Sequence, residues 1–203
     1  QQVALQRMQT PNAFAGRNAF DAVWLLPYDV PDAEIASVAD ADMAALAATP
    51  LLQPMNGVSS ARGRYPDLRP DTNAPPKPCS ISGAPCLALV RGDAEGYLAL
   101  VGTNRRLIDR VEALAQYDHL ASRVPARADA PLPAFQLLAW PLTAHAVTFA
   151  QGDQLAAVDA TCRDISTMRR LGANSDLLIS RMITARLATD GYGRLFADML
   201  SEL

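Results

Sequence analysis

Three cysteines and two histidines carry most of the reactive chemistry in this sequence. Cys79 and Cys86 lie in the stretch ProProLysProCysSerIleSerGlyAlaProCys, where a proline precedes each cysteine. Thiols at this separation can close a small ring, and the prolines stiffen the chain on the approach to each one. We therefore expect a Cys79–Cys86 disulfide, which would place the protein in an oxidising, extracytoplasmic compartment such as the periplasm.

A second combination, His145 with Cys162, could carry nucleophilic catalysis. The two residues lie on either side of Gly152, in predicted helices joined by a tight turn, so a helical hairpin could bring them within about two helical turns. The alternative is a core histidine that bonds a backbone carbonyl beside an inert, buried thiol. We favour the alternative, because Cys162 shares one apolar helical stripe with Leu155, Val158 and Ile165.

The remaining ionisable residues do not form a catalytic set. His119 follows Asp118 at a predicted helix end, where adjacent side chains point in different directions, so we expect a solvated or hydrogen-bonded histidine. No His, Cys, Asp or Glu spacing fits zinc, and no Asp-rich loop fits calcium. We expect Asp40 and Asp42 on a solvated helix face, and we predict no catalytic residue, metal or cofactor.

External contacts are predicted from exposed arginines and tyrosines, which often carry interface energy. One group lies in the Pro-rich loop, and a second lies in the turn between Pro27 and Pro31, which we expect to be exposed. The alternative for the loop is a mobile, solvated segment. The candidate partner-binding residues are Arg62, Arg64, Tyr65, Arg69, Tyr28 and Asp29.

Composition favours helices and argues against several kinds of partner. Half of the 203 residues are apolar, alanine dominates them, and aromatics make up 6%. Such Ala-rich sequences favour closely packed helices over sheets. The net charge of −3 argues against nucleic acid or an anionic membrane, since both need a basic face. Another protein is the expected partner.

The patterns predict an all-α fold, an irregular antiparallel helical bundle or short helical solenoid with a long Pro-rich loop. We expect one domain over 1–203. Residues 1–49 would form a helical hairpin, with helices from about Thr10 or Pro11 to Leu26 and from Pro31 to about Pro50. Residues 50–86, which hold more than half of the prolines, would form a loop closed by the disulfide. Residues 87–203 would form a helical core.

Several finer predictions concern the last third of the chain. Pro141 lies inside a helix predicted over 134–151, so we expect a kink there. Gly172 is expected at a helix end, and Gly191 is expected to break the helix after it. In that helix Leu178, Met182 and Leu187 are in register, so we expect them to be buried.

No apolar run reaches the ~18–20 residues of a membrane span. The chain begins at Gln1 without a methionine, so we expect that a signal peptide, a lipoprotein signal or an N-terminal membrane anchor preceded it.

Two stretches carry a family resemblance. They are AsnAlaPheAspAlaValTrpLeuLeuProTyrAspValPro at 18–31 and CysArgAspIleSerThrMetArgArgLeuGlyAlaAsnSerAspLeuLeuIleSerArgMet at 162–182. They resemble segments of uncharacterised, helical cell-envelope proteins of high-GC proteobacteria, and the match would cover most of the chain. The resemblance implies an extracytoplasmic location and transfers no activity or functional residue.

These observations predict an extracytoplasmic, non-enzymatic protein-binding module. One version is an immunity or inhibitor protein that neutralises an envelope-acting toxin. A second class is a helical carrier or receptor for a small apolar ligand, held in a cavity between Ala-lined helices. A third class is a hydrolase that uses Cys162 and His145.

Overall fold

The computed structural model describes residues 14–50, 59–71, 74–125, 127 and 129–203. These residues form helices and isolated bridges without a β-strand, so the predicted all-α class is confirmed. In chain order the α-helices are α2 (Phe20–Trp24), α3 (Ile35–Ala48), α4 (Cys86–Gly92), α5 (Ala94–Thr103), α6 (Arg105–Glu112), α7 (Trp140–Ala150), α8 (Gln154–Ala173), α9 (Leu178–Arg186) and α10 (Arg194–Leu200). Three short 3₁₀ segments, η1 (Asp32–Glu34), η2 (Ala113–Gln116) and η3 (Phe135–Ala139), and one π-helical segment, η4 (Leu187–Gly193), connect them.

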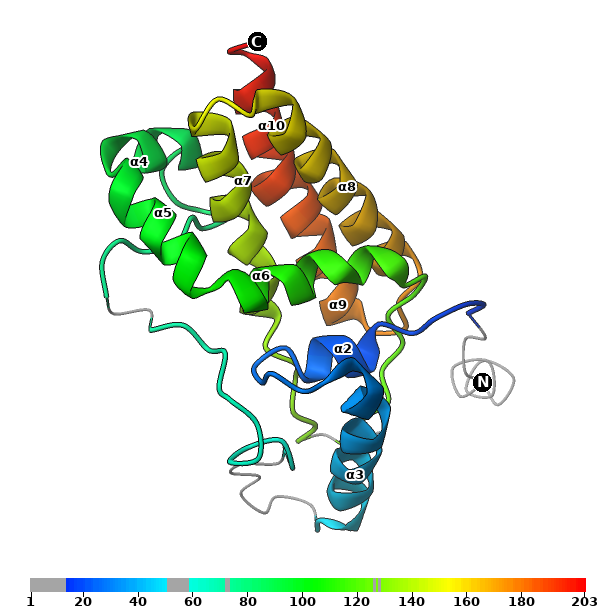
Figure 1. The fold of residues 1–203 in the computed structure, drawn as a ribbon. Helices are drawn as coiled ribbons and strands as arrows, with labels where there is room; N and C mark the ends of the chain where they lie inside the picture. Colours follow the sequence, from blue (N-terminus) through cyan, green and yellow to red (C-terminus); the bar gives the residue numbers. More distant parts are fainter. Residues whose placement is uncertain (1–13, 51–58, 72–73, 126, 128) are drawn as a thin grey trace.

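Helix α7 is the central element of the bundle. It packs against α4, α5, α6 and α8 (Figure 1), and nine of its 11 residues are buried. A helix that is apolar on every side is stable only when other helices cover it. Pro141 lies at the start of α7 instead of inside a longer helix, because the preceding residues form η3. The predicted mid-helix kink is therefore wrong, and Pro141 occupies a position where its missing N–H costs little.

Helix α8 has several polar residues on its buried side. Its buried residues include Thr161, Asp164 and Thr167, while Cys162 is exposed. The prediction of a buried Cys162 stripe is wrong, since the residues that share its spacing are partly or largely exposed. Thr161 and Thr167 donate hydrogen bonds to carbonyls of their own helix at 2.8 and 2.9 Å, which satisfies their hydroxyls inside the core.

The C-terminal helix is continuous from Leu178 to Leu200, because η4 joins α9 to α10 without a turn. The predicted break at Gly191 is therefore wrong, and Gly191 is buried within η4. Gly193 also belongs to this segment, and a Cβ there would lie 2.7 Å from the Ala188 carbonyl oxygen. A glycine thus permits the wider turn at this point of the helix.

From Phe14 onward the N-terminal segment is less helical than the pattern predicts, and the predicted helix start at Thr10 or Pro11 lies outside the described residues. In the described part, the first helix covers only Phe20–Trp24, so the predicted helix to Leu26 is wrong. Gly16 has a φ of 90°, which a right-handed helix excludes. Asn18 forms an isolated bridge with His119, which is buried and outside any helix. The chain is therefore held against the bundle before α2 begins.

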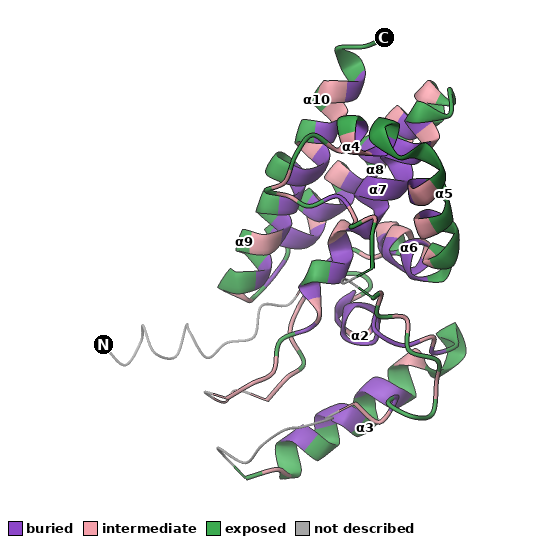
Figure 2. Cartoon of the chain, turned by 90° about the vertical axis from the view of Figure 1, so that its left-hand side faces the viewer, coloured by how far each residue is buried: buried purple, intermediate pink, exposed green. Residues whose placement is uncertain are grey.

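Helix α3 extends away from the bundle below α2 (Figures 1 and 2). Asp42 on this helix is fully buried, which corrects the expectation of a solvated face, whereas Asp40 is exposed and pairs with Arg123. The Asp42 carboxylate accepts hydrogen bonds from Trp24 Nε1 at 2.8 Å and from the Ser60 amide at 2.5 Å. One buried acid therefore joins α2, α3 and the loop that follows them.

The described parts of the Pro-rich loop form no helix before Cys86. The loop contacts α3 through Ser60, and its disulfide end packs on the central helices. Cys79 and Cys86 are bonded, as predicted, with Cys79 buried and Cys86 at the start of α4. The Cys79 amide donates to Thr143 Oγ1 on α7 at 2.9 Å, and Tyr97 donates to the Lys77 carbonyl at 3.0 Å. The loop is therefore tied to the central helices at points other than the disulfide.

Candidate functional site

The structure separates the two residues of the proposed Cys–His pair. His145 faces the core from α7 and is 3% exposed, whereas Cys162 lies on the solvent side of α8. His145 Nε2 instead lies 2.8 Å from Asp164 Oδ2, and Asp164 is 2% exposed. Since residues two positions apart lie on nearly opposite sides of a helix, Cys162 and Asp164 cannot both face His145.

The His145–Asp164 contact belongs to a polar cluster in the core. The ring of Tyr192 lies 6.2 Å from that of His145, and its hydroxyl donates to the Leu138 carbonyl at 2.7 Å. Burial raises the pKa of Tyr192 well above its ordinary value, and burial also raises that of Glu112. This cluster connects α6, α7, α8 and η4. His145, Asp164 and Tyr192 are buried in it, and 21% of the Glu112 side chain is exposed.

The predicted arginine and tyrosine residues gather on one side of the molecule. Residues 66–68 pair with the 27–29 turn through hydrogen bonds from the Asp29 amide to the Pro66 carbonyl and from the Leu68 amide to the Pro27 carbonyl, at 2.9 and 2.8 Å. This pairing places Arg69 over the Tyr28 ring, 5.7 Å from its centroid. Tyr28 itself is buried, so the expectation that it is exposed is wrong.

Most of these side chains already have internal partners. Arg69 forms a bidentate pair with Asp67, which lowers the pKa of that carboxyl. Tyr65 donates to Glu34 at 2.6 Å, and Arg64 lies over the Tyr65 ring. Their role in partner recognition stays a prediction, but these contacts already explain their positions.

Asp29 and Arg62 complete the predicted set. Asp29 accepts a hydrogen bond from Arg106 Nε at 2.7 Å, which joins the turn to α6. Arg62 is exposed, as predicted, and forms an isolated bridge with Tyr65. Asp29 thus acts as a structural contact, and Arg62 is a cation that projects from the loop.

A wide apolar groove lies between the disulfide loop, the segment before α7, and α9. We call it the aromatic groove, and its volume is about 880 Å³. Arg69 and Arg186 are the charged residues in its lining. Its large apolar lining residues are Ile81, Leu132, Phe135, Leu137, Trp140, Ile183 and Leu187.

The apolar surface continues beyond this groove onto the outer side of α9. Leu178, Ile179 and Met182 are 73%, 38% and 59% exposed, and we call these three residues the α9 ridge. Figure 2 shows exposed and intermediate residues along this side of the helix. The prediction that Leu178 and Met182 are buried is wrong, while Leu187 is buried as expected.

A second groove lies on the other side of the ridge, between α8 and α9. This α8–α9 groove has a volume of about 640 Å³, and Arg169 and Arg181 line it together with Ile165 and Met168. At about 100° of rotation per residue, the ridge lies between the α9 residues of the two grooves. The face formed by the ridge and the grooves is the candidate functional site.

Sequence reasoning missed this face for an identifiable reason. Helix α9 has apolar residues on two sides, and the polar Ser180 and Thr184 are the ones that face the core. Gly172 allows α8 to approach α9 so closely that a Cβ there would lie 2.2 Å from Thr184 Oγ1. The adjacent pairs Leu178–Ile179 and Met182–Ile183 were the available signal, since one buried stripe does not need both members of each pair.

The described residues were also searched for a metal site and a membrane span, and the chain was compared with known proteins. Within the described residues, no group of three His, Cys, Asp or Glu side chains is placed to hold a metal ion. The same residues contain no helix long and apolar enough to span a bilayer. No family model, curated protein or solved structure matches the chain.

Proposed function

We propose that this chain is an extracytoplasmic, non-enzymatic module that binds another protein through the aromatic groove and the α9 ridge. The observation that carries the proposal is the exposure of Leu178, Ile179 and Met182 beside an apolar groove. Contiguous exposed apolar surface of this kind commonly marks a protein interaction site. The disulfide is compatible with an oxidising compartment.

The shape of the surface favours a protein over a small molecule. A small apolar ligand is usually held in a pocket that covers most of its surface. The ridge lies outside the grooves and is convex, so a ligand inside the aromatic groove would leave Leu178 and Met182 exposed. A protein surface that inserts an aromatic or aliphatic anchor into the groove could cover both.

A small apolar ligand is the second candidate, and the size and lining of the aromatic groove favour it. Phe135 and Trp140 lie in a groove of about 880 Å³, which is within the range of ligand pockets. The finer assignment to an immunity or inhibitor protein would be one form of the protein-binding function.

The test compares two leucines that are equally exposed. Leu178 on the ridge and Leu155 on α8 are both 73% exposed, so Leu178→Asp and Leu155→Asp change the same kind of surface at two places. Each variant would be used to capture a partner from an envelope extract, and the captured proteins would be quantified by mass spectrometry.

Leu178→Asp should reduce capture of a specific partner at least about tenfold, which corresponds to about 1.4 kcal/mol. Leu155→Asp should capture it like the unmodified protein, and both melting temperatures should stay within a few degrees. Equal loss in both variants would refute the proposed face. Unchanged capture by Leu178→Asp, combined with saturable binding of an apolar dye that Leu132→Asp in the groove lining removes, would favour the small-ligand candidate.

A further inference from the structure

We propose that the partner element that covers the α9 ridge is an amphipathic helix with acidic residues on both sides of its apolar stripe. This inference rests on the proposed function, because it specifies the partner for the same face.

Arginines lie on both sides of the ridge. Arg169 and Arg181 line the α8–α9 groove, and Arg186 lines the aromatic groove. An apolar seam between charged flanks is the arrangement that selects partners in helix pairs, where flanking charges set which helix binds. Since the chain as a whole has a net charge of −3, this local excess of cations is a feature of the face.

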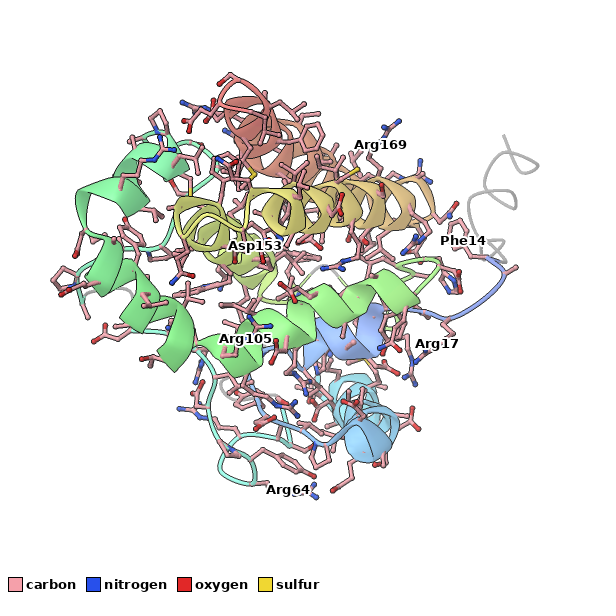
Figure 3. The ribbon with its side chains drawn as sticks, turned by 45° about the horizontal axis from the view of Figure 1, so that its top comes forward. Phe14, Arg17, Arg64, Arg105, Asp153 and Arg169 are labelled. Carbon is pink, nitrogen blue, oxygen red and sulfur yellow. A yellow bond between two sulfur atoms is a disulfide. The ribbon has the colours of Figure 1, made fainter. Side chains whose placement is uncertain are left out.

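Arg169 is the most informative of the three cations. It is exposed, and among the described residues it forms no hydrogen bond or ion pair. Figure 3 shows that it projects outward from α8. Arg181 uses Nε to bind the Ser175 carbonyl at 2.7 Å, and Arg186 has a 3.4 Å contact with Asp190. Arg169 is therefore a cation that a partner carboxylate can reach without breaking an existing contact.

Two aspartates near the same face partly offset its excess of positive charge. Asp190 lies beside Arg186, and Asp176 accepts a hydrogen bond from the Ser122 amide near the start of α9. Both lie at the ends of the face, whereas Arg169 and Arg181 lie along the α8–α9 groove. We therefore expect the acidic residues of the partner to matter most on the α8 side.

The concave parts of the face favour a protein helix over a lipid surface. The grooves on the two sides of the ridge have volumes of about 880 and 640 Å³, and they can receive side chains that project from a partner. Packing of helix ridges into grooves has this form. A flat bilayer surface would contact the ridge and leave both grooves unfilled.

The experiment uses three labelled model peptides of about 18 residues, long enough to form a helix. All three have the same Leu stripe at i, i+3, i+4 and i+7, and their flanking positions are Glu, Gln or Lys. Binding to the full chain would be measured by fluorescence anisotropy at low salt and at about 0.5 M NaCl. Vesicles of phosphatidylcholine, with and without phosphatidylglycerol, would be tested beside them.

The Glu peptide should bind at least about tenfold more tightly than the Lys peptide at low salt, and high salt should remove most of that difference. Arg169→Glu should weaken the Glu peptide about fivefold and strengthen the Lys peptide, with no change in melting temperature. Arg163→Glu, the same charge reversal at an exposed arginine of α8 that lines neither groove, should change neither affinity. Leu178→Asp should weaken all three peptides.

Each contrary result has a distinct meaning. Equal binding of the three peptides, lost in Leu178→Asp, would refute the acidic partner and leave the protein-binding face intact. Binding of anionic vesicles without binding of any peptide would refute it in favour of a membrane surface. A dimer of the chain that Leu178→Asp dissociates would assign the face to a second copy. No binding of any probe would refute the inference and leave the captured partner to test the proposed function.

Discussion

The His145–Asp164 contact is a buried polar interaction in the middle of the bundle. Both side chains are almost fully buried, and their atoms lie 2.8 Å apart. Removing one partner leaves the other polar group unpaired in the core, which usually costs more than the pair itself contributes. This pair therefore holds α7 and α8 in one alignment, because any other alignment would leave both polar groups without a partner.

Replacing Asp164 alone should be strongly destabilising. We expect Asp164→Ala to lower the free energy of unfolding by about 3 kcal/mol, while the double variant His145→Leu/Asp164→Leu should recover most of that loss. Urea denaturation measures both values. If Asp164→Ala lies within about 0.5 kcal/mol of the unmodified protein, the pair does not hold the two helices in register.

Glu112 gives the same cluster a dependence on pH. Burial raises its pKa against the attraction of His145, Arg105 and Arg163. A raised folded-state pKa means that folding favours the protonated carboxyl. The stabilising contribution of the protonated Glu112 carboxyl is therefore fully present below pH 4.5, the ordinary pKa of a glutamate. It is lost as the pH rises through the folded-state pKa.

Glu112→Gln should consequently stabilise the protein at pH 7, by about 1.4 kcal/mol for each unit by which the pKa is raised. At pH 4 the two proteins should unfold alike, because the carboxyl is then largely protonated in the folded state. Denaturation at both pH values tests this, with the exposed Asp159→Asn as control. A larger gain at pH 4 than at pH 7 would reverse the assigned sign.

The environment of a residue could be predicted from the sequence where neighbouring residues determine it. It could not be predicted where tertiary packing determines it. The Cys79–Cys86 bond followed from the short spacing and the flanking prolines. Asp42 and Cys162 were assigned to the wrong environments, because the periodicity of a helix does not show which side faces the bundle. A buried acid that bonds a tryptophan and an amide cannot be told from an exposed one by sequence spacing.

At the scale of elements, the C-terminal helix is the clearest difference from the predicted structure. A glycine normally ends or weakens a helix, so Gly191 predicted a break. The chain instead continues through a π-helical segment, in which Gly193 lies against the Ala188 carbonyl. The same segment places Tyr192 in the core and leaves α9 with its ridge exposed.

Gly193→Ala tests the role of that segment. Alanine has the higher helix propensity, so at an ordinary helical position it should stabilise by up to about 1 kcal/mol. At Gly193 the added Cβ meets backbone at 2.7 Å, and we expect a net loss of stability. Gly102→Ala in α5, where nothing lies within 4 Å of the new Cβ, is the control and should be neutral or stabilising. Stabilisation by both changes would show that η4 does not require glycine.

Other elements were predictable to different degrees. Asp93 caps α5 by accepting a hydrogen bond from the Gly96 amide at 3.1 Å, as an aspartate directly before a helix commonly does. The helix before Pro27 was overestimated, since the apolar residues that suggested it are buried by tertiary contacts around a short helix. Capping is a local signal that sequence preserves, whereas the extent of a buried helix depends on its neighbours.

At the scale of the whole molecule, the disulfide belongs to the proposed binding face. Cys79 lines the aromatic groove, and the ring that it closes forms one side of that groove. Loss of the bond should therefore affect both stability and recognition. The Pro-rich loop thus contributes to the candidate site through its disulfide end, in addition to the predicted role of its arginines.

The double variant Cys79→Ala/Cys86→Ala should lower the free energy of unfolding by roughly 2.5 kcal/mol, from the entropy of closing a ring of about eight residues. It should also weaken partner capture under conditions where it remains folded. In the unmodified, unreduced protein, thiol titration should find one reactive group, Cys162, before unfolding and no additional one afterwards. Three reactive thiols in the native state would contradict the bonded ring.

Photo-crosslinking from the α9 ridge tests directly whether this surface contacts a protein partner. A photoreactive residue at Met182 reports contacts of the ridge, and the same residue at Leu155 or at Arg62 reports contacts of α8 or of the Pro-rich loop. After irradiation in envelope extract, we predict one discrete protein adduct from position 182 and none from position 155. An adduct that forms from position 62 but not from position 182 would contradict the account and assign recognition to the loop.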